Sequence, residues 1–365
     1  MSDILKIEPI DNWLKKNNWS FYNHQIETLK LSENGFDVLL VAPTGGGKTL
    51  AGFLPSLNDL INNKSKKNKL HTLYISPLKA LTIDVHRNLT SPIEDQSLDI
   101  RVETRTGDTS AYKKNRQKIL PPHMLMTTPE SLALLLSNKE SKDYFKDLKY
   151  LIIDEIHVLV NSKRGDLLSL NLSRIHSISP DCKRIGLSAT VKNKETVLKF
   201  LTSKDKAKIL NVKETSLPKI EILETKTRVP WSGHMASYAI KDIYQKIQKS
   251  SLTIVFVNTR AQAELVFNKL WQENDNNLRI AIHHGSLEKE IRRKVENLMS
   301  LGKIDCVVAT SSLDLGIDWG DVDLVIQIGS PKGISRFLQR IGRSNHKFDE
   351  PSNALLVPSN RFEYL

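Results

Sequence analysis

The chain has 365 residues, with 53 lysines and arginines against 41 aspartates and glutamates, a formal net charge of +12. Its only cysteines, Cys182 and Cys306, are too few for a metal quartet or a disulfide framework, which favours a reducing, cytoplasmic compartment. No apolar stretch approaches the ~20 residues that cross a bilayer, so no membrane partner is expected. The positive charge favours a polyanionic partner such as nucleic acid, although a lysine- and asparagine-rich composition alone would produce it.

Strand-like apolar runs alternate with longer helical patterns along the whole chain. Continuous apolar strands joined by helical crossovers are typical of parallel sheets covered on both faces. The length suits two domains, and two successive sets of runs predict an α/β fold with two doubly wound parallel-sheet domains. The predicted strands are 38–42, 72–76, 124–127, 150–154 and 184–188, then 253–258, 279–283, 305–310, 324–328 and 354–357.

A glycine-rich segment at 42–49 reads Ala-Pro-Thr-Gly-Gly-Gly-Lys-Thr, between a predicted strand and a predicted helix start at 50–54. This arrangement is typical of a phosphate-binding loop, in which backbone N–H groups cradle a polyphosphate. Lys48 would reach the β- and γ-phosphates, and the Thr49 hydroxyl would ligate Mg²⁺. Ala42 stands where the general motif has its first glycine, a departure frequent in one branch of these proteins. The predicted nucleotide contacts are Thr44, Gly45, Gly46, Gly47, Lys48 and Thr49.

An acidic pair ends the predicted strand in the segment 151–157, Leu-Ile-Ile-Asp-Glu-Ile-His. Asp154 would hold Mg²⁺, complementing Thr49, and Glu155 would orient and deprotonate an attacking water. Alone, such a pair could simply cap the next helix. Beside a phosphate loop it predicts a hydrolytic site.

The charged stretch 205–235 is predicted to link a domain over 1–204 to a domain over 236–365. Pro218 and Pro230 interrupt any helical pattern there, and 230–234 reads Pro-Trp-Ser-Gly-His, an unusual local cluster. The chain ends soon after a strand-like run, so the second domain is expected to be incomplete at its end.

Two arginines follow a predicted helix at 334–338, in the segment 339–344, Gln-Arg-Ile-Gly-Arg-Ser. Arg340 and Arg343 suit arginine fingers that reach a γ-phosphate from the second domain. A basic helix end that complements the helix dipole is the alternative for this segment in isolation.

In this order, the phosphate loop, the Asp-Glu-x-His segment, Ser-Ala-Thr at 188–190 and the Gln-Arg-x-Gly-Arg segment resemble a superfamily 2 helicase. The finer resemblance is to Lhr-like DExH helicases, through Ser-Lys-Arg-Gly at 162–165, Phe-Val-Asn-Thr-Arg at 256–260, His-Gly-Ser-Leu at 284–287 and the segment 310–318. Segments 103–109 and 230–234 resemble the ligase-associated branch, which is linked to DNA repair. The resemblance covers nearly the whole chain and implies two tandem RecA-like domains.

The resemblance also assigns nucleotide contacts outside the phosphate loop. Phe21 and Gln25 resemble an adenine-recognition element, with a core aromatic and a helix-surface amide as an equal alternative. Gly316 and Asp318 resemble the second domain's contribution to the nucleotide site. Asp314 stands where many relatives have glutamate.

A further group resembles the machinery that couples nucleotide to nucleic acid. His157, Ser188 and Thr190 resemble the coupling residues. Small, hydroxyl or basic residues at strand ends resemble the contacts that hold a strand by its phosphates and sugars without reading bases. The predicted strand contacts are Ser76, Pro77, Lys79, Arg105, Thr106, Gly107, Thr128, Pro129, Asn258, Thr259, Arg260, His284, Thr310 and Ser311.

The resemblance implies a monomeric ATP-dependent helicase that uses ATP and Mg²⁺ and moves 3′ to 5′ on single-stranded DNA or a tailed duplex, in a repair set with a DNA ligase and a nuclease. Lhr-like proteins continue into a winged-helix domain and further modules, so the chain is expected to be truncated and to unwind poorly. An RNA helicase stays open as an alternative, because nothing in the motifs rejects a 2′-hydroxyl. A nucleotide-gated clamp without productive unwinding is the second alternative, although the presence of Glu155, Arg340 and Arg343 argues against it. A small-molecule kinase also uses a phosphate loop, but it would not need the second domain's arginines or the phosphate-contacting strand ends.

Overall fold

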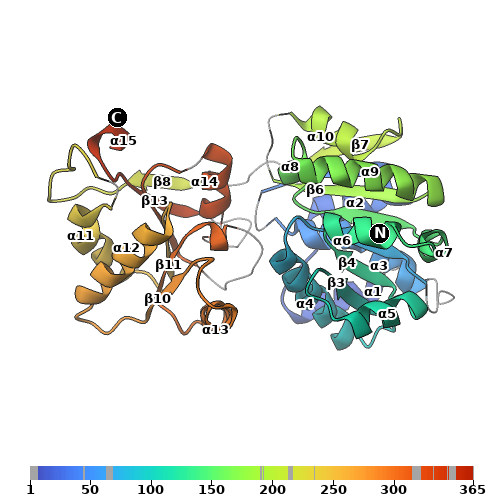
Figure 1. Ribbon diagram of the computed structural model, residues 1–365, viewed down its shortest axis with the longest axis horizontal. Coiled ribbons are helices and arrows are strands. Elements are labelled where there is room, and N and C mark those ends of the chain that lie inside the picture. Colours follow the sequence, from blue (N-terminus) through green and yellow to red (C-terminus); the bar gives the residue numbers. More distant parts are fainter. Residues whose placement is uncertain are drawn as a thin grey trace. The chain divides into compact units, whose positions relative to one another are not determined.

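The computed structural model describes residues 7–43, 46–62, 69–189, 191, 193–212, 217–233, 235–314, 322–331, 333–342, 344 and 351–364. The chain forms two compact units, domain 1 with residues 1–43 and 47–213, and domain 2 with residues 214–365. Each is an α/β domain built on a parallel sheet (Figure 1). The predicted fold of two doubly wound domains is confirmed.

Domain 1 is built on a seven-stranded sheet in the order β3-β4-β2-β5-β6-β1-β7, in which every pair of neighbours is parallel. Its five inner strands are the apolar runs that the sequence predicted, and almost every residue in them is buried. The strands are β1 (Asp37–Val41), β2 (Thr72–Ile75), β3 (Val102–Arg105), β4 (Met124–Thr127), β5 (Tyr150–Ile153), β6 (Lys183–Ser188) and β7 (Ala207–Asn211).

Helices cover both faces of this sheet. One core lies under α1 to α4, with Phe53 and Val85 among its buried side chains. The other lies under α6 to α10, with Leu132 and Leu172 among its buried side chains. The helices are α1 (Glu8–Lys16), α2 (Asn23–Glu33), α3 (Lys48–Asn62), α4 (Lys79–Asp95), α5 (Ala111–Ile119), α6 (Pro129–Leu136), α7 (Ser141–Phe145), α8 (Ile156–Leu159), α9 (Lys163–Ile178) and α10 (Lys194–Leu201).

Domain 2 repeats the plan with six parallel strands in the order β10-β11-β9-β12-β13-β8. Helices α11 and α12 bury one face, through residues such as Ile243 and Val266, and α13 covers part of the other, through Val295 and Met299. The elements are β8 (Lys219–Ile222), α11 (Ile240–Ile247), β9 (Thr253–Phe256), α12 (Arg260–Gln272), β10 (Ile280–His283), α13 (Lys289–Ser300), β11 (Cys306–Ala309), β12 (Leu324–Ile328), α14 (Ile334–Ile341), β13 (Asn353–Val357) and α15 (Arg361–Tyr364).

The segment predicted as a linker, 205–235, contains one strand of each sheet. Strand β7 pairs with β1 along its whole length, and β8 pairs with β13. The expected linker is therefore too long, because both strands are edge strands whose polar residues hide them in the sequence.

In a parallel sheet the carboxyl ends of all strands meet at one edge, where ligands of doubly wound domains bind. Most predicted site residues lie in the loops that follow these carboxyl ends, in domain 1 and in domain 2 alike. The sheet therefore gathers motifs that are more than 100 residues apart in domain 1, such as Lys48 and Ser188.

Candidate active site

The phosphate loop leaves the carboxyl end of β1 and enters α3 at Lys48. Lys48 is 9% exposed, and its ammonium donates hydrogen bonds of 2.8 Å to the carbonyls of Ala42 and Pro43. The side chain thus bends back over the loop, where a phosphate could replace the carbonyls as partner. Thr44 and Gly45, also predicted contacts, lie outside the described residues.

Gly47 is the described glycine of the loop whose conformation demands glycine. Its φ is +64°, and a Cβ atom there would lie 2.5 Å from Nε2 of Gln25 and 3.2 Å from the Tyr22 ring. Nε2 of Gln25 donates to the Gly47 carbonyl at 3.1 Å, and Oε1 accepts from the Tyr22 N–H at 2.9 Å. Gln25 thus holds the loop in place through its amide.

The aromatic beside the loop is Tyr22, which the sequence analysis missed. Phe21 packs against the core of domain 1, as its core-aromatic alternative expects. Phe21 and Tyr22 are adjacent in the sequence, and either ring could face the phosphate loop. The presence of a second aromatic residue beside Phe21 was therefore the signal that could have pointed to Tyr22. The predicted contact of Phe21 and Gln25 with adenine remains a prediction.

The acidic pair follows β5. Asp154 is 4% exposed and its carboxylate accepts hydrogen bonds from the Tyr74 hydroxyl at 2.6 Å and from the Glu155 N–H at 2.8 Å. Glu155 has left-handed backbone angles, φ 45° and ψ 40°, which non-glycine residues rarely adopt. Such strain is typical of functional sites, where the surrounding structure holds a side chain in a fixed direction.

Without a ligand, the protein disfavours the ionised form of Asp154 beside Glu155. Burial, followed by the neighbouring Glu155 charge, raises the pKa of Asp154 from 3.8 to about 6, although Lys48 opposes the rise. Oε2 of Glu155 is buried and accepts no hydrogen bond from the described residues. A buried carboxylate, Asp154, beside a second carboxylate with one buried and incompletely partnered oxygen forms a site suited to a cation and to a water molecule.

His157 joins the acidic pair to β6. Its Nδ1 lies 3.4 Å from Oε2 of Glu155 and 3.2 Å from Oγ of Ser188, at the carboxyl end of β6. Burial, followed by the charge of Lys48, lowers the pKa of His157 to about 4, so the ring is neutral near pH 7. The predicted coupling residues His157 and Ser188 are thus in contact, and Thr190 lies outside the described residues.

The donor set fits Mg²⁺ held together with a nucleotide. No group of three or more His, Cys, Asp or Glu that could hold a metal ion occurs in the described part of the chain. Mg²⁺ at phosphate sites needs only one or two carboxylates, because substrate phosphates and waters complete its octahedron. Asp154 supplies the carboxylate, and Thr49 lies in the first turn of α3 next to Lys48.

The predicted strand contacts of domain 1 lie in the loops after β2, β3 and β4 and are unequally exposed. The exposed ones are Lys79 and Gly107, and the Lys79 ammonium pairs with Asp108 at 2.9 Å beside Gly107. Pro129 begins helix α6 and Thr128 caps it. The buried ones are Ser76, Pro77, Arg105, Thr106, Thr128 and Pro129.

Arg105 does not fit the predicted contact with a strand. Its side chain is 8% exposed, and Nη1 donates to the Lys114 carbonyl at 2.8 Å and to Oε1 of Gln117 at 3.4 Å. The guanidinium therefore holds helix α5 against β3. The prediction assumed that a basic residue at a strand end has an exposed side chain. Arg105 is buried, so its assignment as a strand contact is corrected.

Arg164, in the Ser-Lys-Arg-Gly segment at 162–165, connects two of the predicted strand-contact loops. Nη1 donates to the Pro77 carbonyl at 2.6 Å, and Nη2 donates to Oε2 of Glu130 at 3.0 Å while Nε contacts the other oxygen. The following residue, Gly165, has no room for a side chain, because a Cβ atom would lie 2.0 Å from the Leu159 carbonyl oxygen at the end of α8. The first turn of α9 thus packs tightly against the helix that follows the acidic pair.

The predicted contacts of domain 2 lie after β9, β10 and β11. Asn258 donates to the Ser330 carbonyl at 2.8 Å, and Thr259 caps α12. His284 is 4% exposed, and its Nε2 lies 2.8 Å from Oε1 of Glu264. The exposed contacts are Thr259, Arg260 and Ser311, whereas Thr310 is buried.

Arg340 also departs from its prediction. The side chain is 2% exposed, with Nε 2.7 Å from Oδ1 of Asp314, Nη1 2.6 Å from Oε1 of Gln327, and the guanidinium 4.6 Å from the centre of the Phe256 ring. All these partners belong to domain 2. The guanidinium is thus committed to the interior of its own domain and lacks the exposure that an arginine finger needs. Arg343, Gly316 and Asp318 lie outside the described residues.

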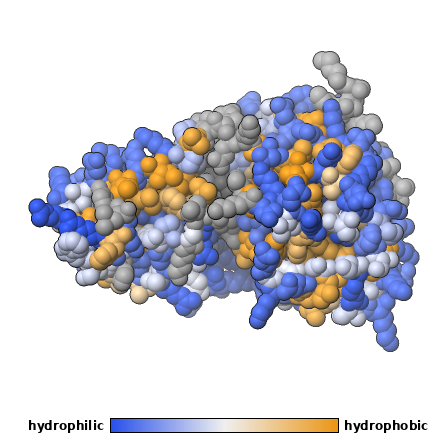
Figure 2. All heavy atoms as spheres, turned by 90° about the horizontal axis from the view of Figure 1, so that it is seen from above, coloured by the Kyte–Doolittle hydropathy of each residue, from blue (hydrophilic) through white to orange (hydrophobic). Residues whose placement is uncertain are grey.

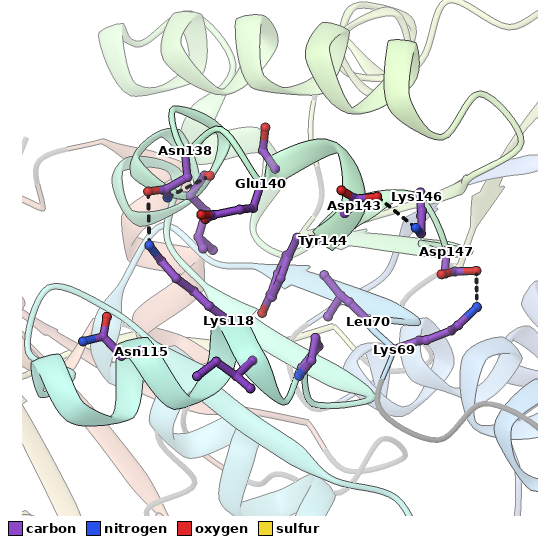
Figure 3. Close-up of a pocket in the computed structure, with 14 residues that line it drawn as sticks. Lys69, Leu70, Asn115, Lys118, Asn138, Glu140, Asp143, Tyr144, Lys146 and Asp147 are labelled. Atoms are coloured by element: carbon purple, nitrogen blue, oxygen red, sulfur yellow. Dashed lines mark hydrogen bonds and ion pairs between the residues drawn. The ribbon is translucent and has the colours of Figure 1, made fainter.

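Domain 1 also contains a cavity of about 790 Å³, whose lining residues are drawn in Figure 3. Its lining includes Leu70, just before β2, and Pro121, just before β4, so it opens at the amino-terminal edge of the sheet. Ion pairs Lys69–Asp147 and Lys146–Asp143 flank it. No predicted site residue lines this cavity.

Two family models match the chain, "DEAD/DEAH box helicase" over residues 22–197 and "Helicase conserved C-terminal domain" over residues 237–346. The first spans the phosphate loop and the acidic pair, and the second spans Asn258, His284 and Arg340. The chain belongs to the DEAD/DEAH box helicases.

Among these helicases, this one is Lhr-like. The ATP-dependent helicase Lhr-Core of Methanocaldococcus jannaschii is 38% identical over 372 residues, which are 97% of this chain and 44% of that protein. Lhr-Core protein 2 of Thermococcus barophilus is 36% identical over 377 residues, with the same two coverages. The assignment to the ligase-associated branch remains a prediction.

A solved structure of Mycobacterium smegmatis helicase Lhr, bound to single-stranded DNA and AMP-PNP, superposes with a TM-score of 0.82 at 33% identity. The match covers 98% of this chain and 48% of the Lhr chain, so the chain spans about half the length of the relatives it matches. The likeness confirms the RecA-like fold of both domains. Among the described residues, no helix is long and apolar enough to cross a membrane.

Proposed function

We propose that the chain is an ATP-dependent nucleic-acid motor that hydrolyses ATP with Mg²⁺ and moves 3′ to 5′ on single-stranded DNA. The observation that carries the proposal is the cluster at the carboxyl edge of domain 1. Lys48 and Glu155 act in opposite directions on the charge of Asp154, and His157 connects Glu155 to Ser188. A nucleotide-binding fold without hydrolysis would not need the strained, incompletely partnered Glu155.

The residues have separate roles in hydrolysis. Lys48 neutralises charge on the β- and γ-phosphates, and Thr49 and Asp154 would hold Mg²⁺, which supplies further charge neutralisation when bound. Glu155 orients a water whose oxygen bonds to the γ-phosphorus while the bond to the β–γ bridging oxygen breaks. The water's proton passes to the Glu155 carboxylate.

The neutral His157 gives this step a route to the rest of domain 1. It lies beside Glu155 and Ser188, so a change in the charge of Glu155 alters both contacts. Arg164 joins the loops at Pro77 and Glu130, and Gly165 packs against the end of α8. Nucleotide state and strand contacts therefore share one tightly packed assembly.

DNA is the proposed substrate because the M. smegmatis relative, whose fold this helicase shares, was solved with single-stranded DNA. The net charge of +12 and the exposed Lys79, Arg260 and Ser311 suit a nucleic-acid backbone. The direction of movement, action as a monomer and a repair role beside a DNA ligase and a nuclease are proposed from the resemblance.

The test is the ATPase rate without nucleic acid, with single-stranded DNA, and with single-stranded RNA of matched sequence. We expect stimulation by DNA greater than by RNA. No stimulation by either would overturn the motor, and stimulation by RNA alone would replace DNA as substrate. Displacement of a strand from 3′-tailed but not 5′-tailed duplex would support the direction, and the reverse preference would overturn it.

A further inference from the structure

An exposed aromatic cluster in domain 2 is built by two segments that are far apart in the sequence. Hydrophobic side chains reach the surface in several places on the face drawn in Figure 2, and single exposed ones are ordinary on proteins. Here Trp231 is 65% exposed and Phe362 is 74% exposed, with ring centres 6.4 Å apart. The Arg361 guanidinium lies 4.4 Å from the centre of the Trp231 ring. We call Trp231, Arg361 and Phe362 the aromatic cluster.

The backbone around the aromatic cluster is fixed by hydrogen bonds. The Arg361 N–H donates to the Pro230 carbonyl at 2.9 Å, and Nδ2 of Asn360 donates to the Gly233 carbonyl at 3.2 Å. These bonds tie the loop 230–233 to the start of α15. The backbone that carries Trp231 is thus held in position before any ligand arrives, which reduces the entropy cost of binding.

The aromatic cluster lies on the edge of domain 2 that carries the predicted strand contacts. Helix α15 follows the carboxyl end of β13, as Asn258 follows the carboxyl end of β9. A Cβ atom on Gly329 would lie 3.3 Å from Nδ2 of Asn258, 3.7 Å from Oγ of Ser359 and 3.8 Å from Oε1 of Glu363. Asn258 and the turn into α15 therefore adjoin the same glycine.

The order of the strands places the aromatic cluster in a row of loops at the carboxyl edge of the domain 2 sheet. The loops that follow β10, β11, β9, β12 and β13 lie side by side. From the predicted contacts after the first three strands, the row continues through Ser330 to the aromatic cluster. Neighbouring strands lie about 4.8 Å apart, so β13 lies roughly 10 Å from β9 along this edge.

The chemistry of the aromatic cluster matches an unpaired nucleobase. Exposed tryptophan, phenylalanine and arginine planes stack on bases, and they do so regardless of sequence because every base has a flat face. A motor that must pass over any sequence can use such a contact, whereas hydrogen bonds to base edges would select bases.

We propose that the aromatic cluster stacks a base of the single strand next to the contacts around Asn258, with Trp231 as the principal stacking partner. The proposal rests on the proposed function, because it needs a strand on this edge of domain 2. It adds a base contact to a set of contacts that reach only phosphates and sugars.

The experiment compares W231A with W271A in the full chain, by fluorescence anisotropy of labelled oligo-dT. Trp271 is a matched control, because it is 58% exposed and lies at the end of α12, beside the amino-terminal edge of the same sheet. We expect W231A to weaken DNA binding about tenfold, a loss in the lower part of the range for one stacked base. We expect W271A and W231F to bind within about twofold of wild type.

Two further readouts separate stacking from a purely structural role. The salt dependence of DNA binding should keep its slope in W231A, since stacking releases no counterion, and should become shallower in R361A. Photocrosslinking of oligonucleotides with 5-iodouracil to the wild-type chain should label Trp231, and this readout does not depend on the folding of any variant.

The outcomes are distinguishable. If wild type binds no DNA, the proposed function fails together with the stacking proposal. If wild type binds DNA but W231A matches W271A and no crosslink reaches Trp231, the stacking proposal is overturned and the motor stands. The stacking proposal would also be overturned if a partner protein, and not DNA, shielded the Trp231 side chain from solvent.

Discussion

The charged motif residues of the two domains have opposite surroundings. In domain 1, Asp154 is a buried carboxylate beside the half-buried Glu155, and their described partners do not balance the two charges. Oε2 of Glu155 is itself buried and accepts no hydrogen bond from described residues. In domain 2, Arg340 is equally buried but has Asp314, Gln327 and the Phe256 ring around it.

This difference shows how burial sorts motif residues by role. A buried charge with incomplete partners is strained in the protein alone and gains when a ligand supplies the missing charge. A buried charge with complete partners stabilises its own domain and has little left to offer a ligand. Domain 1 thus resembles a site ready for Mg²⁺ and a nucleotide, whereas Arg340 resembles part of the interior of domain 2.

The sharpest test of this contrast is E155Q. Loss of the general base should lower ATP turnover roughly 100- to 10,000-fold while ATP binding changes little. Steady-state hydrolysis and equilibrium binding of a fluorescent ATP analogue measure the two separately. Turnover within a few-fold of wild type would remove Glu155 as the base.

R340A tests the other side of the comparison. Removal of one partner from a buried ion pair typically costs about 3–5 kcal/mol, since the other charge is left unpaired. Because Arg336 still contacts Asp314 in this variant, we expect a loss at the lower end of that range in the free energy of unfolding of domain 2, measured by urea titration. An arginine finger would instead lower ATPase activity with little change in stability.

R336A is the control for this measurement. Arg336 contacts the same carboxylate, with Nε 3.2 Å from Oδ2 of Asp314, but its side chain is 43% exposed. Exposed pairs contribute about 0–1 kcal/mol. Equal losses in R336A and R340A would contradict the assignment of Arg340 to the interior.

D154N should stabilise domain 1 in the absence of nucleotide and Mg²⁺. The folded-state pKa of Asp154, about 6, lies above its ordinary value of 3.8, so its contribution is lost as pH rises from about 4 to 6. At pH 7 the neutral side chain should add roughly 1–3 kcal/mol to the free energy of unfolding. D108N, at an exposed carboxylate, should change it by less than about 0.5 kcal/mol.

His157 makes the pH profile more informative. Its folded-state pKa, about 4, lies below the ordinary 6.5, so stability is lost as pH falls from about 6.5 to 4. In wild type the two groups oppose each other over this range. In D154N only the His157 contribution remains, and the unfolding free energy should rise more steeply with pH than in wild type.

R164A should have the smallest effect, on strand binding. Loss of the joint contact with the Pro77 carbonyl and Glu130 frees two predicted strand-contact loops, and we expect about tenfold weaker DNA binding, roughly 1.4 kcal/mol. R164K should not restore binding, since one ammonium cannot reproduce the guanidinium geometry. R116A, which removes an exposed pair with Glu103, is the control, and equal losses in both would contradict the role of Arg164.

The fold could be predicted where strands are buried on both faces. All ten predicted strands are present, and nine of them are inner strands, which in a parallel sheet must be continuously apolar; the tenth, β10, is an edge strand. The three missed strands, β3, β7 and β8, are edge strands. In β8 all four residues are exposed, so its composition carries no burial signal.

The candidate site was predictable in its residue types and less so in its partners. Glycine, lysine and paired carboxylates at strand ends carry the chemistry of phosphate binding in their spacing. No local pattern shows that Arg105 faces α5, that Arg340 faces Asp314, or that Tyr22 rather than Phe21 lies against Gly47. These facts depend on residues distant in the sequence, which only the folded chain brings together.

The pairing of β8 with β13 bears on how the two domains form during synthesis. Domain 1 has all its described strands once residue 211 has been made, whereas β8 must wait for β13, the last strand of its sheet. In that interval β8 has no neighbour, and Ile220 and Ile222 are open to other chains. Lys219 and Glu221 alternate with them, and charges in this position discourage aggregation of a nascent strand.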